Sequence, residues 1–133
     1  MTAIPDAHQT FTPGDKSYVS STSPLASVAT VFEDDGDTGY FYALEGDCAD
    51  MHIVDAVQIY ITRNVTDRDR SSELAIIWSA DGMKSALLLN HYPHAVFDFA
   101  AKRSYCRTGF PAPSSHWPDA GHQWSDSAME FFP

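Results

Sequence analysis

The chain has 133 residues, which fits one domain with its own hydrophobic core. Its 18 acidic and 8 basic residues give a formal net charge of −10, which disfavours nucleic-acid binding through a general basic surface and attraction to anionic membranes. A basic protein would be attracted to such a chain, and an aromatic content of 13% argues against disorder. We therefore expect a folded domain whose partner is a protein.

The N-terminal segment, residues 1–27, is rich in Ser, Thr and Pro and shows little hydrophobic periodicity. We expect this segment to be loosely ordered, with one short strand near Tyr18 and Val19. It contains no basic stretch followed by an apolar run, so we predict no signal peptide and a cytoplasmic protein. In a reducing cytosol, Cys48 and Cys106 are expected to be unpaired thiols.

Regular structure is predicted to begin with a β-hairpin. Residues 28–33 are rich in β-branched side chains, which is typical of a strand. Residues 34–39 contain the Asp and Gly residues that turns require. Residues 40–44 are predicted to return as a second strand, with Tyr40 and Tyr42 on the same face of the sheet.

Four further segments are predicted as strands. The β-branched content of residues 53–63 favours a strand, although a helix remains an alternative because a helical stripe also fits. Residues 73–79 resemble a central strand, residues 83–89 pair back across a turn, and residues 95–99 form one more strand. We predict a single mainly β domain over residues 28–133, or α+β with little helix, built as an antiparallel meander of about five or six strands.

The C-terminal part of the chain, after residue 100, is loop-like and contains several prolines. Ser125 or Asp126 is predicted to cap a last helical turn that ends near Phe131. Large exposed apolar patches are rare on monomers, so we expect the aromatic side chains of this tail to pack against the sheet. These side chains are Trp117, Trp124, Phe131 and Phe132.

The predicted hairpin turn carries the densest negative charge of the sequence. No lysine or arginine occurs between Lys16 and Arg63, whereas eight acidic residues lie within that interval. Turn residues face solvent and are free to bind, and a basic partner would be complementary to them. We predict three carboxylates as the partner-binding residues: Asp34, Asp35 and Asp37.

Clustered carboxylates also attract calcium, so a metal site in the turn has to be considered. Counted from Glu33, the sixth position of an EF-hand loop is Thr38, where glycine is needed. The twelfth position is Leu44, where a bidentate glutamate is needed. We therefore predict a solvated turn that binds no metal ion, and we predict no cofactor for the domain.

Two other groups of residues carry chemistry. His91, His94 and Asp98 supply the ligand types of a metal site with two histidines and one carboxylate, but Pro93 keeps the histidines off a helix and nothing completes a known metal signature. Cys106 with a histidine could act as a nucleophile and its base, although a small buried thiol is the favoured interpretation.

A basic cluster is formed by Lys102, Arg103 and Arg107. These side chains could bind an anion, or they could pair with the acidic hairpin of the same chain. We favour the internal ion pairs, because the basic residues belong to a strongly acidic molecule.

Four segments together resemble a family of small bacterial proteins known only as a domain of unknown function. They are FEDDGDTGYFYA (residues 32–43), ELAIIWS (73–79), HAVFDF (94–99) and YCRTGFP (105–111). The resemblance covers roughly residues 28–111. It implies a bacterial, single-domain, cytoplasmic protein, and it brings no catalytic residues.

The predicted function is that of a non-catalytic protein-binding module. Its most specific form is an immunity or antitoxin-like inhibitor, whose acidic surface would face a basic partner such as a nuclease. The alternative is a small enzyme or metal-binding domain that uses His91, His94, Asp98 or Cys106. The sequence leaves the oligomeric state open.

Overall fold

The computed structural model describes residues 4–46, 50–65, 70–110, 117 and 122–132. Within these residues the chain forms nine strands in two antiparallel sheets. One sheet has the order β1 (Ile4–Phe11), β6 (Ser72–Trp78), β7 (Lys84–Leu89), β8 (Tyr92–Asp98) and β9 (Arg103–Cys106). The other has the order β2 (Ser17–Thr22), β3 (Val28–Asp34), β4 (Thr38–Glu45) and β5 (His52–Ile61).

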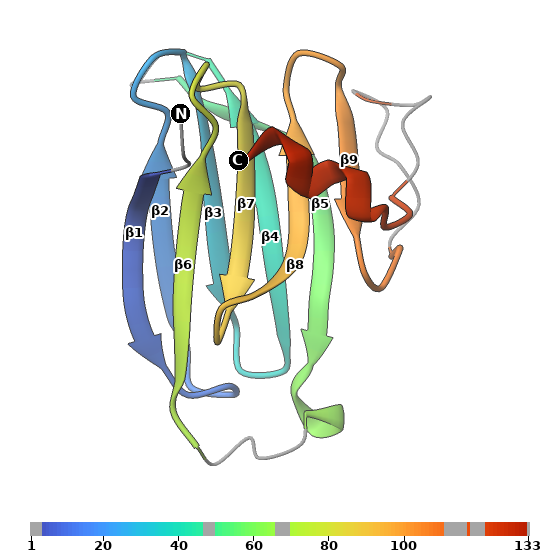
Figure 1. Cartoon of the computed structure of the whole chain (residues 1–133). Helices are drawn as coiled ribbons and strands as arrows, with labels where there is room; N and C mark the ends of the chain where they lie inside the picture. The colour runs from blue at the N-terminus through green and yellow to red at the C-terminus, as the bar shows by residue number, and fades with distance from the viewer. Residues whose placement is uncertain (1–3, 47–49, 66–69, 111–116, 118–121, 133) are drawn as a thin grey trace.

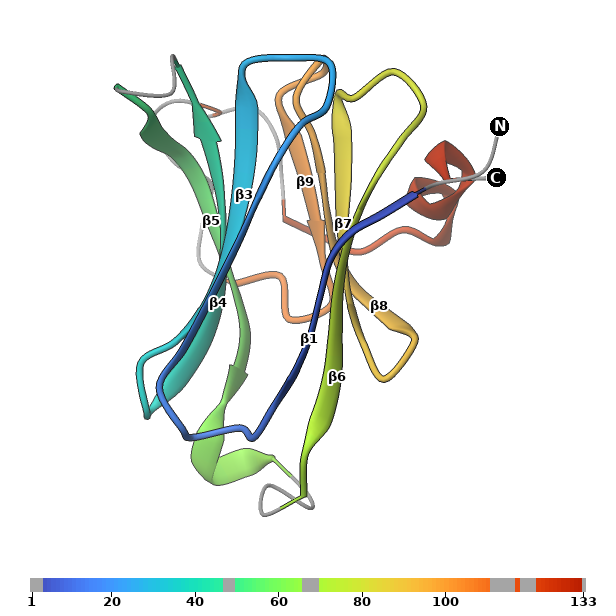
Figure 2. The ribbon, with the colours of Figure 1, turned by 90° about the vertical axis from the view of Figure 1, so that its left-hand side faces the viewer.

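The two sheets pack face to face as a β-sandwich (Figures 1 and 2). The chain changes sheet between β1 and β2 and again between β5 and β6, and the strands within each run follow one another as a meander. The predicted mainly β, single-domain fold with little helix is confirmed. Nine strands are described where the sequence predicts five or six, because β1, β2 and β9 lack a long apolar pattern.

The N-terminal segment is the main correction to the predicted organisation. Residues 1–27 were expected to be loose apart from one short strand, but they supply both β1 and β2. β2 is the edge strand of the four-stranded sheet, and exposed side chains alternate with the buried Val19 and Ser21. An edge strand needs only one apolar face, so a Ser/Thr-rich sequence is sufficient there.

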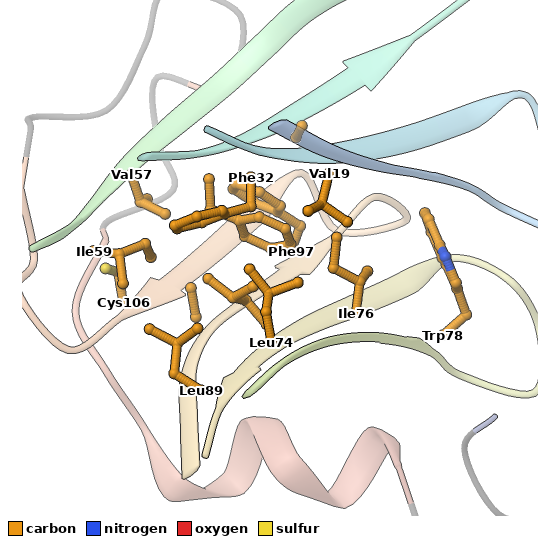
Figure 3. Packing of buried hydrophobic residues seen from close by; sticks show 14 of the residues in the cluster. Val19, Phe32, Val57, Ile59, Leu74, Ile76, Trp78, Leu89, Phe97 and Cys106 are labelled. Carbon is orange, nitrogen blue, oxygen red and sulfur yellow. The ribbon is translucent and has the colours of Figure 1, made fainter. Parts of the chain in front are cut away.

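A single hydrophobic core fills the space between the sheets (Figure 3). Phe32, Phe41 and Phe97 are completely buried, and the rings of Phe41 and Phe97 stack with centroids 4.9 Å apart. The indole of Trp117 meets the rings of Phe97 and Phe99 edge-on at 6.1 and 5.6 Å. Such aromatic pairs add to the gain from burial alone, so this tail residue is part of the core.

Residues 53–63 form most of β5 and then the short 3₁₀ turn η1 (Thr62–Asn64). The strand prediction is therefore confirmed and the helical alternative is wrong. Two register shifts interrupt the pairing of β5 with β4. Asp55 and the neighbouring Val54 are both buried, so at this point β5 places a carboxylate inside the protein.

The two sheets differ in what covers their outer faces. The second 3₁₀ helix, η2 (Asp126–Phe131), lies on the outer face of the five-stranded sheet (Figure 2). There Ala128 is buried against Ala86 and Val96, and Trp124, Phe131 and Phe132 pack around them. The predicted packing of the tail aromatics is confirmed. Among the described elements, none lies on the outer face of the four-stranded sheet.

Candidate functional site

The uncovered face of the four-stranded sheet carries three tyrosines around one carboxylate. Tyr18 of β2, Glu33 of β3 and Tyr40 of β4 are direct neighbours in the strand register, so they form a row across the sheet. Tyr42 lies two residues beyond Tyr40, and the two rings stack with centroids 5.9 Å apart. We call Tyr18, Glu33, Asp35, Tyr40 and Tyr42 the tyrosine–carboxylate face. Tyr18 is 65% exposed, which is unusual for so large a side chain on a strand.

Tyr42 is held in place by Glu33. Its hydroxyl donates a hydrogen bond to the Glu33 carboxylate at 3.2 Å. Partial burial, followed by the negative charge of Glu33, raises the pKa of Tyr42 from 10.0 to about 12. The stability that comes with this shift is complete below pH 10 and is lost as the pH rises through 12, because ionised Tyr42 would lie beside a carboxylate.

We expect Glu33→Gln to lower the pKa of Tyr42 toward its ordinary value, because the substitution removes the charge of Glu33 and leaves the burial and the smaller effects of Asp35 and Tyr40. The measurement is an NMR titration of protein labelled at the tyrosine ring carbons, with Tyr42→Phe to assign the resonance. An unchanged pKa in Glu33→Gln would show that Glu33 does not act on Tyr42.

The three predicted partner-binding residues of the acidic hairpin turn between β3 and β4 differ in their exposure to solvent. Asp35 and Asp37 are exposed, as predicted. Asp34 is only 1% exposed, and its carboxylate accepts hydrogen bonds from the Gly14 and Gly36 amides at 2.7 and 2.8 Å and from the Tyr60 hydroxyl. Asp34 therefore ties the β1–β2 loop, the hairpin and β5 together, and it is not available to a partner.

Asp35 is fixed in a local turn while staying in solvent. Its carboxylate accepts hydrogen bonds from the amides of Asp37 and Thr38, both at 2.9 Å. These backbone donors lower the pKa of Asp35, so its negative charge persists below the usual pH range of an aspartate. The hairpin thus presents a fixed anion beside the tyrosines.

A shallow pocket of about 340 Å³ lies where the tyrosine–carboxylate face meets the hairpin. Tyr18, Glu33 and Asp35 line it together with Lys16, Ser17 and the buried Asp34. An aromatic ring beside carboxylates is the environment that lysine and arginine side chains prefer, since the ring face and the anions both attract a cation.

The alternative metal-ligand set of His91, His94 and Asp98 is not brought together. His91 lies in the β7–β8 turn and Asp98 at the far end of β8, roughly 20 Å away along the strand. The imidazole of His91 pairs with Glu73 at 3.2 Å. His94 lies between these positions, and burial followed by the charge of Arg107 lowers its pKa. Within the described residues, no group of three His, Cys, Asp or Glu side chains could hold a metal ion.

Residues 11–133 match the family described as "Uncharacterized protein conserved in bacteria (DUF2251)". The chain belongs to this family. It is also similar to an "Uncharacterized protein" of Haemophilus influenzae (strain Rd), with 42% identity over 85 residues. That alignment covers 64% of this chain and 53% of the relative, so the match spans about half of the relative's length. No solved structure matches the chain.

Membership of the DUF2251 family confirms the resemblance drawn from the four sequence segments. The match reaches beyond residues 28–111 at both ends, to β1 and to the tail that packs on the five-stranded sheet. In the described part of this DUF2251 protein, no helix is long and apolar enough to cross a membrane.

This DUF2251 protein also contains a buried polar cluster that the sequence did not predict. The cluster lies between β5 of the four-stranded sheet and β9 of the five-stranded sheet. The Asp55 carboxylate accepts a hydrogen bond from the Ser104 hydroxyl and meets Nε2 of His122 at 2.8 and 3.0 Å. All three residues are at most 3% exposed. They have the residue types of a Ser-His-Asp triad, but here the carboxylate stands between serine and histidine, so histidine cannot activate the serine. The cluster instead anchors the tail to β5 and β9.

Cys106 lies next to this cluster and is 1% exposed. Its thiol donates a hydrogen bond to the Gln58 carbonyl at 3.3 Å, and its amide donates to the His122 carbonyl at 3.0 Å. The interpretation as a small buried thiol is confirmed, and Cys106 is free. Cys48 lies outside the described residues, so its predicted free state stays a prediction.

The basic cluster does not pair with the acidic hairpin, contrary to our expectation. Lys102 and Arg103 lie at the β8–β9 turn, at the opposite end of the sandwich from the hairpin (Figure 1). Arg107 stacks between the rings of Tyr92 and Trp124, at 4.4 and 4.1 Å from their centroids. Charge alone misled the prediction, because the antiparallel topology separates the two segments. The exposed hairpin carboxylates, Asp35 and Asp37, therefore do not pair with this basic cluster.

Proposed function

We propose that this DUF2251 protein is a non-catalytic module that binds a basic segment of another protein through the tyrosine–carboxylate face. The observation that carries the proposal is the pocket at which the Tyr18 ring meets the carboxylates of Glu33 and Asp35. A lysine or arginine side chain of the partner would enter this pocket. Its charge would meet two carboxylates, and its alkyl stem would lie against the tyrosine ring.

The charge distribution supports a basic partner. The chain carries a formal net charge of −10, and the two exposed hairpin carboxylates add their field to that of Glu33. Complementary charge accelerates the encounter of two proteins, and salt screens this attraction over about 8–10 Å. Binding is therefore expected to be fast at low salt and to weaken as salt is added.

The tyrosines supply the second half of the proposed interaction. Tyrosine buries a large area at a small cost in side-chain entropy and is enriched among the residues that dominate binding energy. Tyr18 is 65% exposed, and Tyr40 and Tyr42 are partly exposed. Because Tyr42 is fixed by Glu33 and stacks on Tyr40, two of the three rings are already ordered before a partner arrives.

The most specific form of the proposal is an immunity or antitoxin-like inhibitor in the bacterial cytoplasm. A toxin nuclease has a basic substrate-binding surface, and an acidic protein that covers this surface blocks it. The DUF2251 family is conserved in bacteria, which is compatible with this role. Recovery of a toxin that is inhibited by the purified protein would establish it.

We expect the double variant Glu33→Gln/Asp35→Asn to bind an arginine-rich peptide about tenfold more weakly, because two charge-assisted contacts are lost. The matched control is Asp50→Asn/Glu130→Gln, which makes the same two chemical changes at exposed positions outside the face. The measurement is fluorescence anisotropy at low and moderate salt, with a citrulline-substituted peptide as the uncharged comparison. Equal weakening in both double variants would show that only net charge matters and would contradict the proposed site.

A further inference from the structure

β2 is an edge strand whose outward backbone groups are open. The Ser23 amide donates to the Val28 carbonyl at 2.9 Å, and the alternation of an antiparallel ladder makes the odd-numbered residues of β2 those that face β3. The amides and carbonyls of the even-numbered residues therefore point away from the sheet: these residues are Tyr18, Ser20 and Thr22. In the described part of the chain, none of these amides and carbonyls has a hydrogen-bond partner. Figure 2 looks onto this edge of the sandwich, which β1 and β2 form.

The other three sheet edges are protected against an added strand. β1 has a register shift next to Pro5, which has no amide hydrogen to donate. β5 has two register shifts, and its Gln58 amide already donates to the Phe110 carbonyl at 2.8 Å. On β9, the Cys106 amide donates to the His122 carbonyl at 3.0 Å. β2 has none of these devices, since it pairs with β3 without a shift and contains no proline and no charged residue, so its edge is open to strand addition.

The same three residues of β2 also carry their side chains on the exposed outer face of the sheet. A strand added antiparallel to β2 would place every second side chain on this face, opposite them. The side chain opposite Tyr18 would extend the row that Tyr18, Glu33 and Tyr40 form across the sheet. Main-chain hydrogen bonds give an added strand its affinity, and its alternate side chains give it specificity.

The charge beside Tyr18 selects which strand is added. Among the described residues that line the pocket there, the carboxylates of Glu33, Asp34 and Asp35 outnumber the one amine, that of Lys16. Neighbouring strands lie roughly 5 Å apart, so an arginine opposite Tyr18 can lay its stem on the ring and bring its guanidinium toward Glu33. A second copy of this chain would instead bring a further net charge of −10, and its own β2 has no basic side chain to offer. The charges therefore favour a basic segment over a second copy.

We propose that the basic segment of the partner binds in an extended conformation, as a fifth strand that pairs antiparallel with β2. The inference rests on the proposed function and adds the conformation of the partner, with basic side chains at every second position. All strand pairs within the two sheets are antiparallel, and this pairing is slightly more stable per residue than the parallel one. In this arrangement, the partner residues whose side chains reach the outer face are also those whose amides donate to β2.

The test uses the full chain and three octapeptides of alternating arginine and threonine. The first is unmodified, the second is N-methylated at its arginines, and the third is N-methylated at its threonines. All three carry the same charge, but only methylation of the arginines removes the amide hydrogens that would bond to β2. By fluorescence anisotropy, we expect the arginine-methylated peptide to bind at least about tenfold more weakly than the unmodified one, and the threonine-methylated peptide to stay within about twofold.

Ser20→Pro tests the same hydrogen bonds from the side of the protein. The Ser20 amide faces away from β3, so proline removes no internal hydrogen bond and suits an edge strand. We expect Ser20→Pro to weaken binding of the unmodified peptide at least about tenfold, whereas Ser20→Ala, which keeps the amide, stays within about twofold of wild type. Far-ultraviolet circular dichroism checks that both variants fold.

Amide hydrogen exchange locates the added strand. In wild type, the unmodified peptide is expected to slow exchange at the amides of Tyr18, Ser20 and Thr22. If the peptide binds but tolerates methylated arginines or Ser20→Pro, or leaves these amides unprotected, the added strand is wrong while the proposed face stands. If the unmodified peptide does not bind wild type, both proposals fail. Dimers of the free protein that Ser20→Pro abolishes, measured by analytical ultracentrifugation, would make a second copy the occupant and overturn the inference.

Discussion

Replacing Asp55 with alanine is expected to lower the free energy of unfolding by about 3–5 kcal/mol. Asp55 is 1% exposed, and its carboxylate is the shared partner of His122 and Ser104. Without it, the imidazole and the hydroxyl stay inside the protein without their acceptor, and burying such groups unpaired is costly. The measurement is urea unfolding of wild type and variant at neutral pH, followed by circular dichroism and by tryptophan fluorescence.

Two control variants test whether the loss of stability comes from the missing hydrogen bonds of Asp55 or from any substitution of an aspartate in this region. Asp55→Asn keeps one acceptor oxygen and nearly the same volume, so its loss of stability is expected to be smaller than that of the alanine variant. Asp50→Ala removes an exposed aspartate in the loop between β4 and β5, and a change within about 0.5 kcal/mol is expected. A loss in Asp55→Ala below about 1 kcal/mol would contradict the anchoring role of the cluster.

Asp34→Ala is expected to cost about 2–4 kcal/mol, because three hydrogen-bond donors lose their acceptor at once. These donors are the amides of Gly14 and Gly36 and the Tyr60 hydroxyl. The β1–β2 loop, the hairpin and the end of β5 meet at this carboxylate. We therefore also expect faster amide hydrogen exchange at Gly14 and Gly36 in the variant.

The matched control for Asp34 is its neighbour. Asp35→Ala removes an exposed carboxylate whose hydrogen bonds stay within the hairpin turn, so we expect a cost below about 1 kcal/mol in the same urea experiment. If the two variants lose equal stability, Asp34 does not link the three segments. Because of its structural role, Asp34 is also unsuitable for any test of partner binding.

Much of the fold follows from local sequence patterns. The alternation in residues 40–44 places Phe41 in the core and the neighbouring tyrosines outside, and the structure has this arrangement. The β-branched residues 53–61 form a strand. These predictions succeed because strand faces depend on residues two apart in the sequence, which a single sequence shows directly.

The candidate sites depend on contacts that no local pattern contains. Asp34 was predicted to face solvent as a turn residue, but it ends β3 and its partners are 2, 20 and 26 residues away. The contact between Asp55 and His122 spans 67 residues. Predicting such pairs requires the strand order and register of both sheets, and these are set by the whole core.

Tyr18 illustrates the same limit for the proposed binding face. The sequence predicts a short strand near it, but only the pairing of β2 with β3 places its ring beside Glu33 and opposite Tyr40. The observation that no described element covers this face also needs the three-dimensional arrangement (Figure 2). The negative charge and the shared face of Tyr40 and Tyr42 were visible in the sequence, whereas the position of Tyr18 beside them was not.

The most direct measurement is an amide NMR titration of the full chain with an arginine-rich peptide at low salt. The account predicts that shifts concentrate on Tyr18, Glu33, Asp35, Tyr40 and Tyr42, that they weaken with salt, and that the citrulline peptide causes almost none. Shifts centred on η2 and the five-stranded sheet, or small shifts spread over all exposed carboxylates, would contradict a binding site on the tyrosine–carboxylate face.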